Sequence, residues 1–120
     1  MPNAVEASCH CGAVKLQLAA APDTVVDCNC SLCRRYGVLW AYYDAADVTL
    51  LTEPLLTDSY GWNGRHVDFH RCRTCGCVVQ WTPRDARTRR GINARLLEPE
   101  ILAAARLRHR DGANTGKYLD

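Results

Sequence analysis

Residues 28–33 read Cys-Asn-Cys-Ser-Leu-Cys, and the rest of this 120-residue chain is organised around them. Three thiols within six residues leave one unpaired in any scheme of internal disulfides, whereas a divalent metal accepts three thiolates from one tight loop and keeps a fourth position open. The loop therefore predicts an open metal site at Cys28, Cys30 and Cys33. This loop alone leaves open the alternative of a structural zinc knuckle or of a few buried cysteines.

Two further pairs of cysteines flank this loop in the chain. Residues 9–12 read Cys-His-Cys-Gly, and residues 72–76 read Cys-Arg-Thr-Cys-Gly. In each pair the glycine that follows the second cysteine lets the backbone bend tightly around a ligand. Together the pairs complete a closed, tetrahedral zinc site that stabilises the fold. Spacing alone does not say which pair meets which, so the pairing of these half-sites stays open. The four sulfurs of this arrangement are those of Cys9, Cys11, Cys72 and Cys75.

Eight cysteines indicate metal binding or catalysis in a reducing compartment and disulfides in an oxidising one. The first seven residues lack the basic region and the long apolar stretch of a secretory signal. No uninterrupted apolar run approaches the length of a membrane span. We therefore expect a cytoplasmic protein whose dense cysteines bind metal. The even count also suits a secreted disulfide scaffold, which the clustered spacing disfavours.

The charge balance gives little support to a nucleic-acid partner. The formal net charge is +2, from 15 Lys and Arg against 13 Asp and Glu. Metal binding deprotonates thiols, so two Zn²⁺ ions held by four and three thiolates would lower the net charge by three, to −1. The basic balance then disappears.

Short alternating or apolar segments between turn residues predict an all-β fold. At 120 residues the chain has room for one domain, residues 1–120, with a modest core that metal ions would reinforce. A helical turn is expected at 31–36, a turn at 61–64, a short helix at 98–107 and a loosely held polar tail from 111 onward. The expected strands are 14–18, 24–27, 38–43, 47–51, 55–60, 65–70, 77–82 and 91–96.

The three cysteine motifs, in this order and at these separations, resemble the glutathione-dependent formaldehyde-activating enzyme family, which includes centromere protein V-like proteins. The resemblance covers about residues 8–97, and the chain is short after this region compared with longer relatives. It implies a β-tent fold, a structural zinc on the two flanking pairs and a second zinc on the central loop. It also implies a carbon–sulfur lyase-type activity, in which the thiol of glutathione adds to formaldehyde to give S-hydroxymethylglutathione.

An open three-thiolate site suits such chemistry independently of the family resemblance. A free cysteine thiol has a pKa of about 8.5, and zinc coordination deprotonates and orients a thiol. Three anionic thiolates also make the zinc a weak Lewis acid, so a labile metal that a thiol substrate displaces is a second reading. The competing class is a non-enzymatic zinc module that binds a protein or nucleic acid, with both metals structural. The fourth ligand at the central site separates the enzyme from the module.

Few other polar residues suggest chemistry. His66 and His70 flank the second pair and are weak candidates for acid–base groups, although a solvated strand face is the simpler interpretation. Cys77 is expected to be a small buried hydrophobe, and His10 is expected to point outward. Position alone suggests that the side chains of residues 29 and 31 turn toward the cysteine sulfurs.

Arginines and aromatic residues are two further groups of candidates. Four arginines crowd one loop, where we expect them to be solvated, with binding of substrate carboxylates as the alternative. The aromatic side chains are expected to form core and cleft wall. The arginines are Arg84, Arg87, Arg89 and Arg90, and the aromatic residues are Trp40, Tyr42, Tyr60, Trp62 and Trp81.

Overall fold

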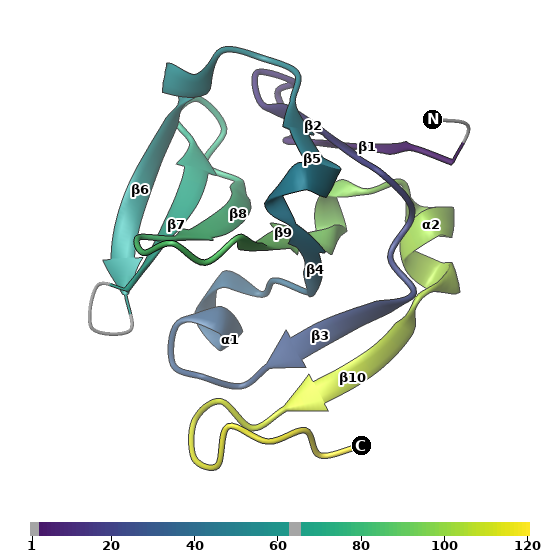
Figure 1. Cartoon of the computed structure of the whole chain (residues 1–120), viewed down its shortest axis with the longest axis vertical. Coiled ribbons are helices and arrows are strands. Elements are labelled where there is room, and N and C mark those ends of the chain that lie inside the picture. Colours follow the sequence, from purple (N-terminus) through teal and green to yellow (C-terminus); the bar gives the residue numbers. More distant parts are fainter. Residues whose placement is uncertain (1–2, 63–65) are drawn as a thin grey trace.

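The computed structural model describes residues 3–62 and 66–120, which form two β-sheets, two short α-helices and three 3₁₀ turns (Figure 1). The expected all-β fold is confirmed. Asn63 and Gly64 of the expected turn, and Arg65 at the start of an expected strand, lie outside the described residues. Neither helix in the described ranges is long and apolar enough to cross a membrane.

The ten strands divide into a small and a large sheet. The small sheet has the order β1-β2-β5, and the large sheet has the order β10-β3-β4-β9-β8-β7-β6. The strands are β1 (Val5–Ser8), β2 (Lys15–Leu18), β3 (Thr24–Cys28), β4 (Trp40–Asp44), β5 (Val48–Leu50), β6 (Thr57–Trp62), β7 (Val67–Cys72), β8 (Val78–Pro83), β9 (Arg89–Asn93) and β10 (Arg106–Arg110). The helices are α1 (Cys33–Tyr36) and α2 (Pro99–Ala104), and the 3₁₀ turns are Ala45–Asp47, Pro54–Leu56 and Ala94–Leu96.

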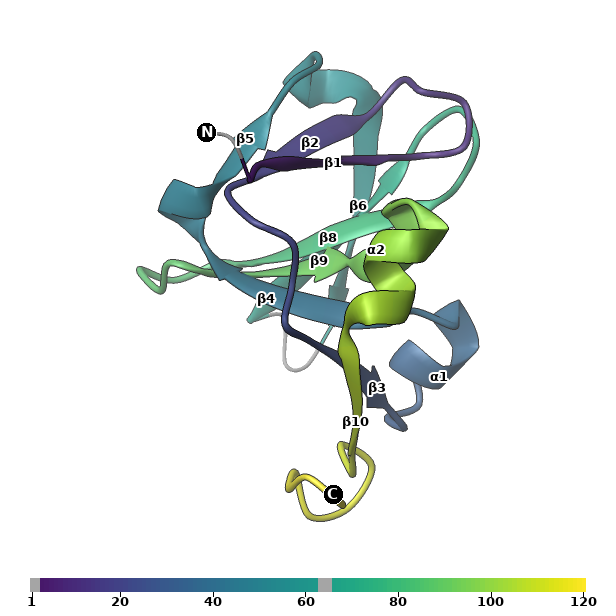
Figure 2. The ribbon, with the colours of Figure 1, turned by 90° about the vertical axis from the view of Figure 1, so that its right-hand side faces the viewer.

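The strands of the large sheet separate two apolar clusters. In β3, Val25 packs into the first cluster and Val26 into the second, because successive side chains of a strand point to opposite faces. The first cluster holds Leu16 and Leu18 of the small sheet, and α2 packs against it. The second contains Trp40 and contacts the central cysteine loop. Figures 1 and 2 show the small sheet at one end of the molecule and β3 with β10 at the other.

The expected elements at the C-terminal end are partly wrong. The helix ends at Ala104 rather than at residue 107, and β10 follows it and pairs with β3 in parallel. The strand expected at 91–96 ends at Asn93, whose side-chain oxygen accepts a hydrogen bond from the Arg95 amide and starts a 3₁₀ turn. At the other end, β1 forms before residue 14, where no strand was expected, because it pairs with β2 over four residues.

The tail after residue 110 is ordered by hydrogen bonds, so its expected looseness is wrong. Asp111 is buried, and its carboxylate accepts hydrogen bonds from Asn29 and from the amide and hydroxyl of Thr115. The Asp111 amide also donates to the carbonyl of Lys117 at 2.8 Å. A buried carboxylate must be satisfied by donors, and this requirement folds residues 111–117 into a compact turn, here called the C-terminal turn.

Replacing Gly91 should destabilise the sheet. Gly91 is buried in β9 opposite Trp81 of β8, and a methyl group at this position would overlap the indole ring of Trp81. Overpacking of this kind costs about 3 kcal/mol, which corresponds to a fall of roughly 10 °C in Tm. Thermal melting of Gly91→Ala measures this fall in Tm. The double variant Gly91→Ala/Trp81→Leu should lose less than the sum of the two single variants, and additive losses would contradict the assigned clash.

Candidate metal centres and their cavity

The two flanking cysteine pairs meet in one cluster, here called the closed cluster. The Sγ atoms of Cys9 and Cys11 lie 3.7 Å apart, those of Cys11 and Cys72 lie 3.6 Å apart, and all four Sγ atoms, including that of Cys75, lie within 4.8 Å of one another. A tetrahedral zinc ion with Zn–S bonds of about 2.3 Å separates its ligand sulfurs by about 3.8 Å. A disulfide would require about 2.05 Å, and all eight cysteines are free thiols. The closed cluster therefore fits zinc.

Local backbone geometry builds the closed cluster from distant parts of the chain. Cys9 directly follows β1 and Cys72 ends β7, so the cluster joins the small sheet to the large one. Gly12 and Gly76 adopt φ angles of 82° and 80°, which only glycine adopts without strain. The amide of Val14 donates to Cys9 Sγ at 3.3 Å. Amide donors of this kind stabilise thiolates, so this arrangement suits a structural metal.

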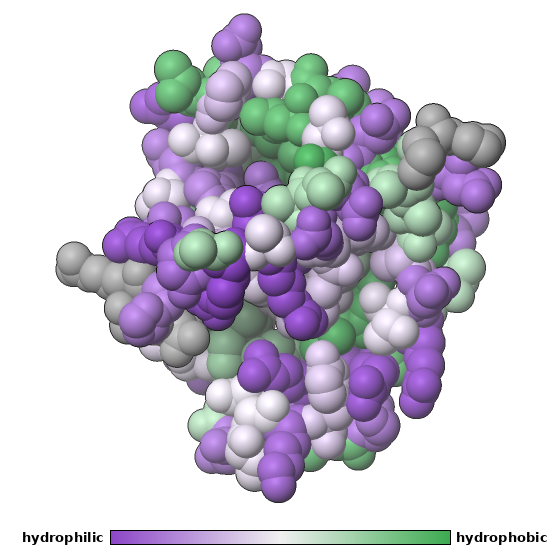
Figure 3. All heavy atoms as spheres, viewed as in Figure 1, coloured by the Kyte–Doolittle hydropathy of each residue, from purple (hydrophilic) through white to green (hydrophobic). Residues whose placement is uncertain are grey.

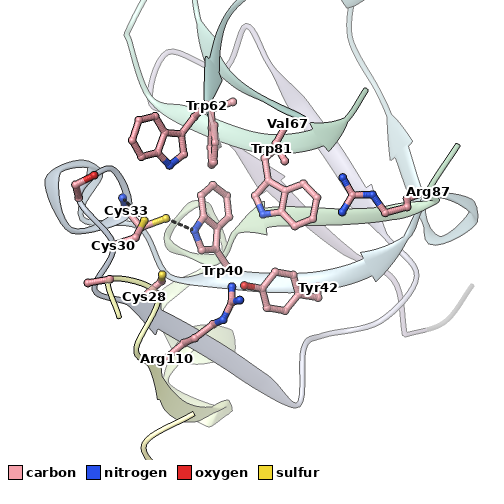
Figure 4. Close-up of a pocket in the computed structure, with 14 residues that line it drawn as sticks. Cys28, Cys30, Cys33, Trp40, Tyr42, Trp62, Val67, Trp81, Arg87 and Arg110 are labelled. Carbon is pink, nitrogen blue, oxygen red and sulfur yellow. Dashed lines mark hydrogen bonds between the residues drawn. The ribbon is translucent and has the colours of Figure 1, made fainter. Parts of the chain in front are cut away.

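The central loop forms a second cluster, here called the open cluster. Its three sulfurs come from the end of β3, the following turn and the start of α1, and they lie within 4.8 Å of one another. The Cys33 amide donates to Cys30 Sγ at 3.3 Å, and the indole N–H of Trp40 donates to Cys33 Sγ at 3.3 Å (Figure 4). Among the described residues, no fourth Cys, His, Asp or Glu joins this group. The donor set of Cys28, Cys30 and Cys33 thus fits zinc with one coordination position left over.

The thiols of the open cluster share their protons unequally. The Cys33 thiol lowers the pKa of Cys28 to about 5, and the nearby positive charge of Arg110 contributes to this shift. The reverse interaction with Cys28, together with burial, raises the pKa of Cys33. Cys28 is therefore a thiolate at neutral pH even without a metal, which suits a metal ligand.

A cavity of about 550 Å³ opens directly onto the open cluster. Five of its 14 lining residues are aromatic, and Figure 3 shows the surface hollowed between the C-terminal tail and the rest of the molecule. The expectation that aromatic side chains form the cleft wall holds for Trp40, Tyr42, Trp62 and Trp81, which line the cavity with Phe69. Tyr60 lies outside the cavity lining and is 48% exposed. The cavity is large enough to enclose a small organic ligand.

Two arginines and one tyrosine supply polar groups to this cavity. Arg87 and Arg110 both line it, and Figure 4 shows the Arg110 guanidinium beside the Tyr42 hydroxyl. Burial raises the pKa of Tyr42 to about 12, and the Arg89 guanidinium lies 4.2 Å from the centre of its ring. Tyr42 therefore keeps its proton at neutral pH and can donate a hydrogen bond into the cavity.

The candidate histidines do not meet the open cluster. His66 is exposed, and His70 shares a hydrogen bond of 2.8 Å with the hydroxyl of Thr82. Neither of them lines the cavity. His10 is exposed as expected, and Cys77 packs partly buried against the first apolar cluster, outside both metal clusters.

The expectation for the Asn29 side chain needs correction. The Asn29 amide does not face the sulfurs: its Nδ2 donates to the Asp111 carboxylate and its Oδ1 accepts from the Ala113 amide, each at 3.0 Å. An anionic carboxylate is a stronger acceptor than sulfur. Of the four arginines expected to be solvated, Arg84, Arg87 and Arg89 are exposed and Arg90 is half-buried. Arg84 forms an ion pair with Asp68, and only Arg87 of the four lines the cavity.

The end of β10 and the C-terminal turn supply a wall that the sequence did not predict. Arg110, Gly112 and Ala113 line the cavity, and all of them follow the region in which the cysteine motifs lie. A Cβ atom on Gly112 would lie 2.5 Å from Cys28 Sγ and 3.3 Å from Cys30 Cβ. The turn thus packs directly on the cysteine loop. The available signal was the alternation of arginines at 106, 108 and 110, which is typical of a strand.

Gly112→Ala should weaken metal binding at the open cluster and leave the fold intact. The added methyl group cannot fit against Cys28 Sγ, so either the turn or the sulfur must shift. Supporting contacts of metal ligands are worth about 10- to 100-fold in affinity, and we expect a loss of about tenfold in competition with a zinc chelator. Lys117→Ala, an exposed change in the same turn, is the control. Unchanged zinc affinity in Gly112→Ala would contradict the close packing.

Comparisons with known proteins agree with this geometry. A sequence model of the family described as glutathione-dependent formaldehyde-activating enzyme matches residues 4–109. The crystal structure of a Rhodobacter sphaeroides protein is similar at a TM-score of 0.70 and 27% sequence identity, over 85% of this chain and 98% of that one. The family match extends across both cysteine clusters.

Proposed function

Because this chain belongs to the glutathione-dependent formaldehyde-activating enzyme family, we propose that its open cluster serves carbon–sulfur chemistry on a small thiol and an aldehyde. The observation that carries this proposal is that three sulfurs face a cavity, with no fourth ligand among the described residues. A purely structural site would have its coordination completed by the protein. The closed cluster, which joins two sheets, suits the structural role.

In the addition reaction, the thiol sulfur bonds to the carbonyl carbon, and the proton of the thiol ends on the carbonyl oxygen. The reverse reaction is the lyase step. A zinc ion bound by Cys28, Cys30 and Cys33 would supply a Lewis acid with one open coordination position. The chain's own groups orient the reactants around this position.

Three features of the cavity support the chemistry. The indole N–H of Trp40 fixes the Cys33 sulfur, so the cluster keeps its shape while ligands exchange. The aromatic side chains in the cavity wall reduce the contact of a bound ligand with water, which strengthens its polar interactions. The Tyr42 hydroxyl is protonated at neutral pH and lies at the cavity, and in this proposal it would donate a hydrogen bond to the oxygen that gains the proton.

The experiment that tests this proposal measures exchange between ¹³C-formaldehyde and S-hydroxymethylglutathione by NMR. The adduct also forms without a catalyst, so the readout is the rate above that background. Protein with two zinc ions per chain should raise the exchange rate in proportion to its concentration. Zinc-replete protein that leaves the rate at background would refute the enzymatic role and favour a zinc module that binds a macromolecule.

Zinc content after exposure to glutathione separates two forms of the proposal. If the metal stays bound while the thiol reacts, the protein retains two zinc ions per chain after gel filtration in glutathione. If the thiol displaces the metal, the protein retains one, held by the closed cluster. Loss of both ions would contradict the structural role of the closed cluster.

A further inference from the structure

Arg110 lies beside the open cluster because of strand pairing. In the parallel ladder between β10 and β3, Arg110 is the partner of Cys28. Paired residues of adjacent strands project from the same face of a sheet, and Figure 4 shows the guanidinium beside Cys28 and Tyr42 at the cavity. Arg110 also lies just beyond residues 4–109, the part of the chain that matches the family.

The Arg110 guanidinium is available for a ligand. Its Nε donates to the carbonyl of Gly116 at 3.2 Å, and no carboxylate in the described ranges lies within ion-pair distance of it. The other arginine of the cavity, Arg87, already binds both carboxylate oxygens of Asp85, at 2.8 and 3.0 Å. Arg110 is therefore the cavity's uncommitted cation in the described part of the chain.

The cysteine loop itself holds Arg110 in place. The backbone amide of Asn29 donates to the Arg110 carbonyl at 3.2 Å. The Asn29 side chain also bonds the two residues that frame Gly112, namely Asp111 and Ala113. One residue between two cluster cysteines thus fixes the position of Arg110 relative to the sulfurs. Such preorganisation reduces the entropy that a ligand contact costs.

We propose that Arg110 binds a carboxylate of the thiol substrate, so that this protein selects thiols that carry a carboxylate. The inference rests on the proposed function and names the substrate class of the same cavity. Three thiolates around a divalent zinc carry a net charge of −1, which would repel an anionic ligand. A guanidinium beside the cluster offsets this repulsion and offers a planar pair of donors that matches a carboxylate. Aromatic side chains line the same cavity and reduce the access of water to the pairing, which strengthens it.

The test measures binding without turnover. The methylated sulfur of S-methylglutathione cannot add to an aldehyde, and binding of this ligand can be followed, without any aldehyde present, through the fluorescence of the three cavity tryptophans. Its diethyl ester, which lacks both carboxylates, serves as the matched ligand. We expect the wild-type protein to bind the acid more tightly than the ester. In Arg110→Gln the affinity for the acid should fall roughly 10- to 100-fold, while that for the ester stays within about twofold. Arg110→Lys keeps the charge but not the paired donors, so its affinity for the acid should lie between those of the wild type and Arg110→Gln.

Arg106→Gln is the matched control, because it makes the same charge change on an exposed residue of the same strand, outside the cavity lining. It should leave both affinities unchanged. The proposal is overturned if the wild type does not distinguish acid from ester, if Arg110→Gln weakens both ligands equally, or if that variant no longer holds two zinc ions, which would assign the guanidinium to the thiolates alone. A protein that binds the acid selectively but shows no exchange with formaldehyde would retain this inference and lose the proposed reaction.

Discussion

Cys72→Ser should leave the protein unfolded at 25 °C. Cys72 is 1% exposed, and its Sγ lies 3.6 Å from that of Cys11 across 61 residues of sequence. A structural zinc site contributes about 10–16 kcal/mol in zinc-finger peptides, whereas a whole domain is stable by only about 5–15 kcal/mol. Loss of one ligand at the junction of the two sheets therefore removes most or all of the net stability.

Circular dichroism and zinc analysis measure this effect. The variant should show no cooperative melting transition, and wild-type protein treated with a strong chelator should show the same loss. Cys77→Ser is the matched control, because Cys77 lies outside both clusters and is partly buried. It should keep two zinc ions and melt within about 5 °C of the wild type. If Cys72→Ser melts as cooperatively as this control does, the closed cluster has no structural role.

Cys30→Ser should abolish catalysis and leave a folded protein with one zinc ion. Cys30 is half-buried in the turn after β3, belongs to the open cluster and lines the cavity. The two sheets are joined by the closed cluster, which does not include Cys30. The remaining two sulfurs cannot form a stable three-ligand site. We expect the exchange rate above background to fall at least about 1000-fold, which corresponds to about 4 kcal/mol of transition-state stabilisation.

Zinc stoichiometry, melting and the NMR exchange assay should be measured on the same preparation. If Cys30→Ser melts cooperatively, holds one zinc ion per chain and exchanges formaldehyde only at the background rate, the two clusters have separate roles. Cys77→Ser again serves as the control for replacing a thiol by a hydroxyl. A Cys30→Ser protein that unfolds would show that the open cluster is structural, and one that retains full activity would place the chemistry elsewhere.

The sequence predicts the clusters well because metal coordination is a strong local constraint. Three cysteines in six residues must lie close together in any fold, as Cys28, Cys30 and Cys33 do. The distant pairs left a choice of partners, and the structure brings Cys11 and Cys72 to 3.6 Å. The sequence also predicts the strand β2, because apolar and polar residues alternate in it. Leu16 and Leu18 are buried and Gln17 is exposed, as this alternation requires.

The cavity's C-terminal wall could not be predicted in this way. Residues 98–107 have the composition of a short helix, and the switch to β10 after Ala104 depends on β3 offering an edge with free hydrogen-bonding groups. The polar tail looked unconstrained because its anchor, the hydrogen bond between Asn29 and Asp111, joins residues 82 positions apart.

The sequence by itself determined the all-β class, the three cysteine motifs and the resemblance to the family, because cysteine spacing and strand alternation act over a few residues. Only the tertiary structure placed Arg110 beside Cys28 and packed Gly112 on its sulfur. These contacts arise from the pairing of two strand edges far apart in the chain, and backbone hydrogen bonds of that kind are open to almost any residue.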